Sequence, residues 1–220
     1  MIFWNCLLAA LAFAQTNPAA NPYDTLTNDE RIVLAAQARK DLADGYLIVR
    51  LNTNKNKIEA LKKQLAQPNL SGQQRERLQK MLETTQQETT QNNRWLAEAF
   101  QAHYDFSKFI FMPDTASATL KKGMTKGIFL NANLQPDASI DIAGKPYFIA
   151  AYGTSSNAGA SGTEGLAILD KNFHELPSPF PHFNGLTGIR KIFSGIFGGS
   201  SEADFYQKLV LKLNKKLREH

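Results

Sequence analysis

The strongest constraint on the fold is a set of short apolar runs that recur along the chain between segments of helical pattern. The runs are rich in β-branched and aromatic residues, which favour strands, and they are apolar at consecutive positions. They occupy residues 46–51, 109–112, 147–152 and 166–169. A strand with two apolar faces is buried on both sides of its sheet, so helices have to cover both faces. The pattern predicts an α/β fold with a mixed sheet of about five strands covered by helices.

Two further segments are weaker strand candidates. The stretch "GIFLNAN" at 127–133 is predicted as a strand, and residues 139–142 are predicted as a short edge strand. A loop of small residues at 154–164 joins the last two strong runs and allows them to pair in an antiparallel way. A short helix is expected around Ser117 to Lys122.

The first helix is expected to begin at Thr27 or Asn28, because acidic residues follow immediately, and to end before Gly45. Its apolar positions include Ile32, Val33 and Leu34. These positions are therefore candidates for its buried face.

Two consecutive helices after the first strand predict a helical hairpin inserted at 55–101. The first covers residues 55–66 and is followed by a break at Pro68. The second starts from Ser71, with Gln74 completing a capping box, and extends to about Phe100. Its middle, "ETTQQETTQNN", is polar, so the hairpin is expected to pack at its ends and to be hydrated between them. A partner-binding face is the alternative interpretation.

Two apolar helical segments close the chain. In the first, apolar residues at helical spacing form a candidate interaction surface: Ile189, Ile192, Phe193, Ile196 and Phe197. In the second, from about Glu202 to Arg218, one side carries Leu209, Val210, Leu213 and Leu217, and the other side is basic. Such a helix also suits an anionic membrane surface. Because a sheet with two apolar faces needs cover, we expect both segments to pack on the sheet.

The first fourteen residues are predicted to be a signal peptide. They carry no charge, contain an apolar run from Leu7 to Phe13 and end in Ala12-Phe13-Ala14, which fits signal peptidase cleavage before Gln15. The absence of Lys and Arg before the apolar run departs from most export signals and leaves open a start upstream of Met1. Cys6, the only cysteine, would leave with the peptide. The mature chain would then have no disulfide, thiol nucleophile or cysteine-bound metal.

The remaining chain is expected to comprise a flexible stretch at 15–26 and a single α/β domain at 27–220. The net charge is +5, with basic excesses at 51–104 and at 171–220. No basic run is interleaved with aromatic residues, so nucleic acid is not an expected partner.

Catalytic and metal motifs are incomplete. "HELPS" at 174–178 has Ser178 where a zinc motif needs its second histidine, so His174 and Glu175 are interpreted as turn residues after a strand. "GASGT" at 159–163 lacks the last glycine of a nucleophile elbow around Ser161. His103 and Asp105 are two metal-ligating residues, which is too few for a site. Five acidic residues remain candidates for a catalytic pair: Asp137, Asp141, Glu164, Asp170 and Glu175.

Three segments, "DGYLIVRLNTNKNKIEALKK", "EAFQAHYDFSKFIFMPD" and "EGLAILDKNFHELPSPFPHF", followed by a basic C-terminal helix, resemble a family of exported proteins of Bacteroidota bacteria that has no assigned activity. The resemblance implies export and supplies no site residues. The last two strands and the final helix also resemble thioredoxin-like domains, whose redox chemistry needs the cysteines that the mature chain would lack.

These observations favour a non-catalytic exported module of the cell envelope, in the periplasm or outside the cell, that binds a protein, a glycan or a membrane surface. An exported hydrolase without a recognisable motif is the alternative. No catalytic residue, cofactor or metal ligand is assigned.

Overall fold

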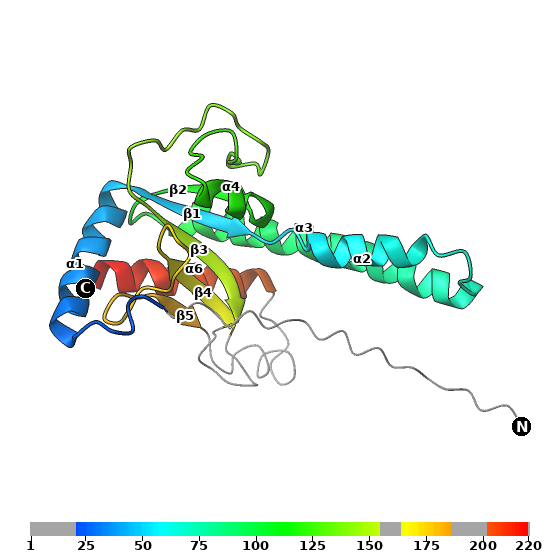
Figure 1. The fold of residues 1–220 in the computed structure, drawn as a ribbon, viewed down its shortest axis with the longest axis horizontal. Coiled ribbons are helices and arrows are strands. Elements are labelled where there is room, and N and C mark those ends of the chain that lie inside the picture. Colours follow the sequence, from blue (N-terminus) through cyan, green and yellow to red (C-terminus); the bar gives the residue numbers. More distant parts are fainter. Residues whose placement is uncertain (1–20, 155–163, 186–201, 220) are drawn as a thin grey trace, which may run out of the picture.

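The computed structural model describes residues 21–154, 164–185 and 202–219. Its elements follow one another as α1 (Asn28–Asp44), β1 (Tyr46–Leu51), α2 (Lys55–Leu65), α3 (Gly72–His103), β2 (Lys108–Pro113), the 3-10 turn η1 (Asp114–Ala116), α4 (Ser117–Lys121), β3 (Tyr147–Thr154), β4 (Glu164–Leu169), β5 (Phe183–Gly185) and α6 (Glu202–Glu219). The strands form one sheet in the order β2-β1-β3-β4-β5. The chain therefore has the predicted α/β architecture (Figure 1).

The sheet is mixed. β1 is parallel to both β2 and β3, whereas β4 is antiparallel to β3 and to β5. The runs at 147–152 and 166–169 thus pair in the antiparallel way that the connecting loop allows. Because β2 and β3 lie on opposite sides of β1, the strand order reverses at β1.

Strands β1, β2, β3 and β4 each contribute side chains to two hydrophobic clusters, one on each face of the sheet. In β1, Leu47 and Val49 belong to the larger cluster and Ile48 to the smaller one. In β2, Phe111 and Met112 divide in the same way. This alternation explains why these runs are apolar at consecutive positions.

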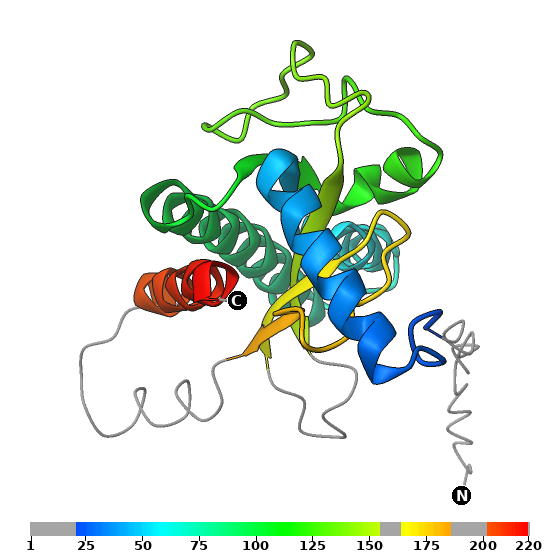
Figure 2. The same cartoon turned by 90° about the vertical axis from the view of Figure 1, so that its left-hand side faces the viewer.

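The two faces are covered differently. Helices α3 and α6 lie on one side, where α1 also contributes to the larger cluster, and α4 lies on the other (Figure 2). The second face is otherwise covered by irregular chain, through Phe129 and Ile142. The expectation of helices on both faces thus holds only in part, because one helix of five residues and a long connection cover the second face.

Two predicted strands are wrong and one strand was not predicted. Residues 127–133 and 139–142 make only isolated bridges, through Leu130 and Asp141, and form no ladder. The fifth strand is instead β5, which approaches β4 closely at Gly165. A Cβ atom there would lie 2.5 Å from the carbonyl oxygen of Asn184, so only glycine fits.

Helix α1 begins with the expected cap, since Thr27 and Glu30 form a reciprocal capping box. The expected apolar positions are largely not the buried ones: Ile32 is 56% exposed and Val33 is 69% exposed. The buried residues are Ala35, Ala38 and Leu42, spaced by three and four. The helix thus packs mainly through two alanines and Leu42, whereas Ile32 and Val33 point away from the core.

Helices α2 and α3 form the predicted hairpin, and its distal part projects away from the sheet (Figure 1). We call this projecting part, residues 55–94, the arm. Ser71 and Gln74 form the predicted capping box at the start of α3. Only the last part of α3, from Leu96 to Phe100, enters the larger cluster beside the sheet.

The final helix, α6, packs as predicted. Leu209, Val210, Leu213 and Leu217 are fully buried in the larger cluster. The carboxyl ends of α6 and α3 are joined through Asp105, which lies 2.7 Å from a guanidinium nitrogen of Arg218. No helix in the described part of the chain is long and apolar enough to span a membrane.

Candidate functional site

A cavity of about 530 Å³ opens at the carboxyl ends of the parallel strands β1 and β2. In open α/β sheets, ligands bind outside the carboxyl ends of the strands, and this cavity lies at that edge of the sheet. We call this cavity the cationic cleft. It is lined by Arg50, Asn52, Thr53, Asn54, Lys55, Asn56, Lys57, Asp114 and Thr115.

Three hydrogen bonds to two neighbouring elements, η1 and α3, fix the loop that forms the cleft. The Thr53 hydroxyl donates to Asp114 over 2.5 Å, and the Asn54 amide donates to Thr89 of α3 over 2.6 Å. Asn93 donates to the backbone oxygen of Asn52 over 2.7 Å. A loop held in this way loses little conformational entropy when a ligand binds. The cleft is therefore preorganised.

The charge of the cleft is positive. Arg50, Lys55 and Lys57 line it together with a single carboxylate, Asp114. Arg50 donates from Nε to the Ser117 hydroxyl of α4 over 2.9 Å, which orients its guanidinium group. Lys55 Nζ lies 3.8 Å from Glu59, and because both side chains are largely exposed this pair is weak. The cleft can thus attract an anion, and its amides and hydroxyls can bond a polar ligand.

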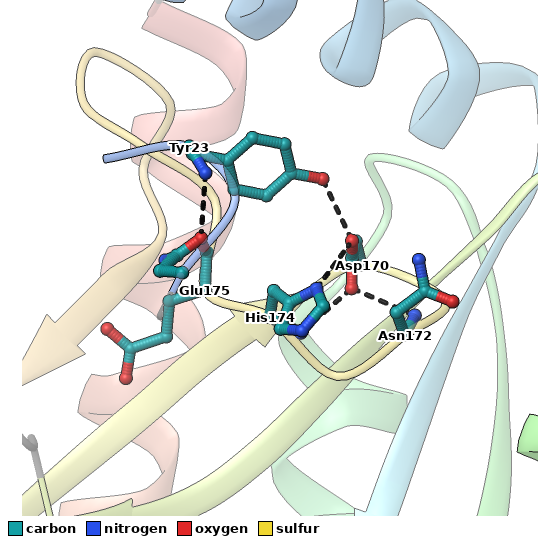
Figure 3. Close-up of polar contacts among 6 residues, drawn as sticks. Tyr23, Asp170, Asn172, His174 and Glu175 are labelled. Atoms are coloured by element: carbon teal, nitrogen blue, oxygen red, sulfur yellow. Dashed lines mark hydrogen bonds and ion pairs between the residues drawn. The ribbon is translucent and has the colours of Figure 1, made fainter. Parts of the chain in front are cut away.

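A second cavity of about 530 Å³ lies at the other edge of the sheet, where β3 begins, between α1 and the β4–β5 connection. At its wall, Asp170 is buried and accepts hydrogen bonds at 2.8 to 2.9 Å from the Tyr23 hydroxyl and from the backbone N–H groups of Asn172 and His174 (Figure 3). The two backbone bonds close the turn after β4. The third bond attaches the N-terminal segment to it.

The protonation states at this cavity favour a structural role. Burial and the hydrogen bond to Asp170 raise the pKa of Tyr23 to about 12, so its phenol keeps the proton at neutral pH. Burial and the charge of Asp170 also raise the pKa of Tyr147. A protonated phenol bonded to a carboxylate that already accepts two backbone N–H groups supplies neither a nucleophile nor a free base.

The residues of the HELPS motif lie in the turn after β4, as predicted. His174 Nδ1 is 3.6 Å from Asp170, and the backbone oxygen of Glu175 accepts a hydrogen bond from Asn21. The Glu175 carboxylate points away from Asp170 (Figure 3). Asn21 and Tyr23 belong to the stretch predicted to be flexible, and they hold its described part against this turn.

The other acidic candidates do not converge. Glu164 accepts a hydrogen bond from Tyr152, whereas Asp137 and Asp141 accept bonds from backbone N–H groups two residues ahead in their own turns. No group of three metal-ligating side chains occurs within the described residues. In the described part of the chain, the hydrogen bonds of Asp137, Asp141 and Glu164 therefore link none of these acids to Asp170.

The partners of Asp105 come from α6. Asp105 is bonded by Arg218 and Asn214, and these hydrogen bonds hold the pKa of its carboxyl below the usual value. Ser161 and the candidate interaction surface, Ile189, Ile192, Phe193, Ile196 and Phe197, lie outside the described residues.

Motif analysis missed the cationic cleft. Its signal in the sequence is the run "NTNKNK" at 52–57, directly after a buried strand, where polar and basic residues begin the next helix. This signal has no fixed spacing, and Asp114 joins the cleft only through the pairing of β1 with β2. No protein-family profile, curated protein sequence or solved structure matches the chain.

Proposed function

We propose that this protein is an exported, non-catalytic module of the cell envelope that binds an acidic glycan in the cationic cleft. The observation that carries the proposal is the convergence of Arg50, Lys55 and Lys57 on a preformed cavity at the carboxyl edge of the sheet. Carboxylate or sulfate groups of a glycan are the complementary charges. The expected signal peptide would bring the protein into contact with such polymers.

The uncharged lining favours a sugar over other anionic partners. Asn52, Thr53, Asn54, Asn56 and Thr115 offer amides and hydroxyls, which can donate to and accept from sugar hydroxyl groups. Among the described residues, no aromatic side chain lines the cleft, whereas proteins that bind single-stranded nucleic acid stack bases on aromatic rings. The same described lining also lacks the large apolar anchors that dominate protein–protein interfaces.

The acid–base chemistry of the cleft supports binding without hydrolysis. Most glycoside hydrolases use two carboxyl groups that flank the scissile bond. Among the described residues, the lining of the cleft includes one, Asp114, and that group accepts a hydrogen bond from Thr53. We therefore favour binding over the hydrolase alternative.

The proposal is tested by calorimetric titration of the mature chain with two short probes, a sulfated heparin tetrasaccharide and a carboxylated polyguluronate tetrasaccharide. Binding of either probe is expected. Replacement of Arg50 and Lys55 by Gln should weaken binding about tenfold, which corresponds to about 1.4 kcal/mol. The matched control, Lys62→Gln with Lys63→Gln, removes the same charge from residues that do not line the cleft and should change affinity less than about twofold.

Melting curves establish that each variant is folded, and Lys55→Gln alone serves as a milder variant because Lys55 is exposed. If neither tetrasaccharide binds, or if the control pair weakens binding as much as the cleft pair, the proposal is wrong. Release of new reducing ends from either probe would instead favour the hydrolase.

A further inference from the structure

A second depression continues from the cationic cleft onto the arm. It has a volume of about 290 Å³ and lies between α2 and α3, and Lys57 lines both it and the cleft. We call it the arm groove. Its other lining residues include Arg77, Lys80, Met81 and Glu88. One cationic side chain thus joins the two concave surfaces.

The arm groove continues the positive charge. Lys57, Arg77 and Lys80 line it with one carboxylate, Glu88. Within the described parts of the chain, none of these three cations forms an ion pair. Exposed cations without a partner are available to an anionic ligand, and their attraction for it weakens as the salt concentration rises.

The groove runs outward along the arm. Asn54 at the base of α2 bonds Thr89 of α3. Two buried residues, Leu61 of α2 and Leu82 of α3, lie farther from the base, as expected for two antiparallel helices. From Glu88 to Arg77 the helix rises about 16 Å at 1.5 Å per residue. Together with the cleft, the lining residues of the groove therefore define an elongated track along the arm. The arm itself projects away from the sheet (Figure 1).

We infer that the ligand is a linear acidic polysaccharide that runs from the cationic cleft along the arm groove; this inference rests on the proposed function. The chain contacts Arg50 and Lys55 at the cleft, passes Lys57, and contacts Arg77 and Lys80 on the arm. A polymer with a charge on each repeat can engage these sites together, so the later contacts gain from a high effective concentration.

The lining of the groove agrees with a sugar polymer. The exposed Thr84 contributes a hydroxyl, whereas Thr85 is buried. Among the described residues that line the groove, no aromatic ring is present on which bases would stack. Met81, which is 41% exposed, is the single apolar side chain among its lining residues. One apolar residue is too little for an interface that depends on buried apolar anchors.

The inference is tested by comparing heparin oligosaccharides from tetrasaccharide to dodecasaccharide in the same titration. In the parent chain, affinity should rise at least tenfold with length. Replacing Arg77 and Lys80 by Gln should leave the affinity for the tetrasaccharide unchanged and remove most of this rise. The cleft variant Arg50→Gln with Lys55→Gln should weaken the binding of every length, whereas the control Lys62→Gln with Lys63→Gln should retain both affinity and rise.

The outcomes separate the two proposals. If the tetrasaccharide binds and longer chains bind no tighter, or if Arg77→Gln with Lys80→Gln keeps the full rise, the extended track is wrong while the proposed function stands. If no length binds, the proposed function itself fails. If single-stranded DNA of equal charge binds as tightly as the dodecasaccharide, the assignment to a polysaccharide is overturned.

Discussion

Asp170 shows how one buried carboxylate can determine the local structure at the level of single residues. It caps the turn that follows β4 and fixes the Tyr23 segment, which is far away in the sequence. A charged group is buried at low cost only when its acceptor sites are occupied. The three donors meet that condition and explain why this acidic residue serves the fold.

Removal of one donor should lower stability. Tyr23→Phe deletes the hydroxyl that bonds Asp170, and because Tyr23 is half-buried we expect a loss of about 1 kcal/mol in the free energy of unfolding. For a chain of this size, this corresponds to a fall of roughly 2 to 4 °C in the melting temperature. Tyr46→Phe is the matched control, because no hydrogen bond of the Tyr46 hydroxyl occurs among the described residues. Equal melting temperatures for Tyr23→Phe and the parent would contradict the structural role of this bond.

The same bond predicts an alkaline instability. The pKa of Tyr23 is about 12 in the folded protein and 10.0 for the ordinary tyrosine, so the stabilisation is fully present below pH 10 and is lost as the pH rises toward 12. In that window the unfolded chain releases a proton that the folded chain retains. Urea titrations on both sides of pH 10 should show that the difference in stability between the parent and Tyr23→Phe shrinks with rising pH. A constant difference would argue against the raised pKa.

At the level of whole elements, α6 is a helix whose buried face the sequence predicts well. The predicted residues Leu209, Val210, Leu213 and Leu217 are all fully buried, and Tyr206 joins them on the same face. In α1 the same reasoning misled, because the helix buries two alanines and one leucine and leaves Ile32 and Val33 outside. The size of a side chain therefore indicates the buried face only when the partner surface leaves room for it.

The α6 face provides a direct test of its packing. Replacing Leu209 and Leu213 by Asp removes two fully buried apolar side chains, each worth about 1.5 to 3 kcal/mol, and adds two buried charges. The combined loss is comparable to a typical free energy of unfolding of about 5 to 15 kcal/mol, so the chain should unfold. Leu211→Asp is the matched control, because Leu211 is 48% exposed and should tolerate the change. Far-ultraviolet circular dichroism distinguishes the results, and a folded double variant would show that α6 does not pack here.

The strands that are buried on both faces can be predicted from the sequence, since their apolar runs are bounded by turn residues. Strand β5 cannot be predicted in this way, because three residues that pair with an already formed strand have no period of their own. The strands predicted at 127–133 and 139–142 are wrong, because similar residues there cover the sheet as irregular chain. The cationic cleft has no local signature, because Arg50, Lys55 and Asp114 line one cavity only after β1 and β2 pair.

At the level of the whole molecule, the arm is separate from the two hydrophobic clusters. Its buried apolar residues, Leu61 and Leu82, belong to neither cluster. The larger cluster takes in α3 only from Leu96 onward. The sheet and the helices packed on it, here called the body, therefore fold around contacts that residues 62–81, the distal arm, do not provide. Under the proposed function, the role of the arm is to lengthen the binding surface.

This separation predicts that the distal arm can be removed. Replacing residues 62–81 by a short Gly- and Asn-containing turn would retain the buried residues Leu61 and Leu82 and the bond between Asn54 and Thr89, while deleting Arg77 and Lys80. We expect cooperative unfolding with a loss of about 1 kcal/mol, mainly because the capping box at Ser71 is lost. Ser71→Ala in the full chain measures that contribution alone and is the control.

The shortened chain should also bind the tetrasaccharide as the parent does and lose the gain in affinity with oligosaccharide length. Thermal melts and the same titrations measure both properties on one preparation. A collapse of the melting transition beyond that of Ser71→Ala would mean that the distal arm supports the body through α3. Retention of cooperative unfolding together with loss of the length dependence would assign the arm to ligand contact, because folding and binding would then have been separated within one variant.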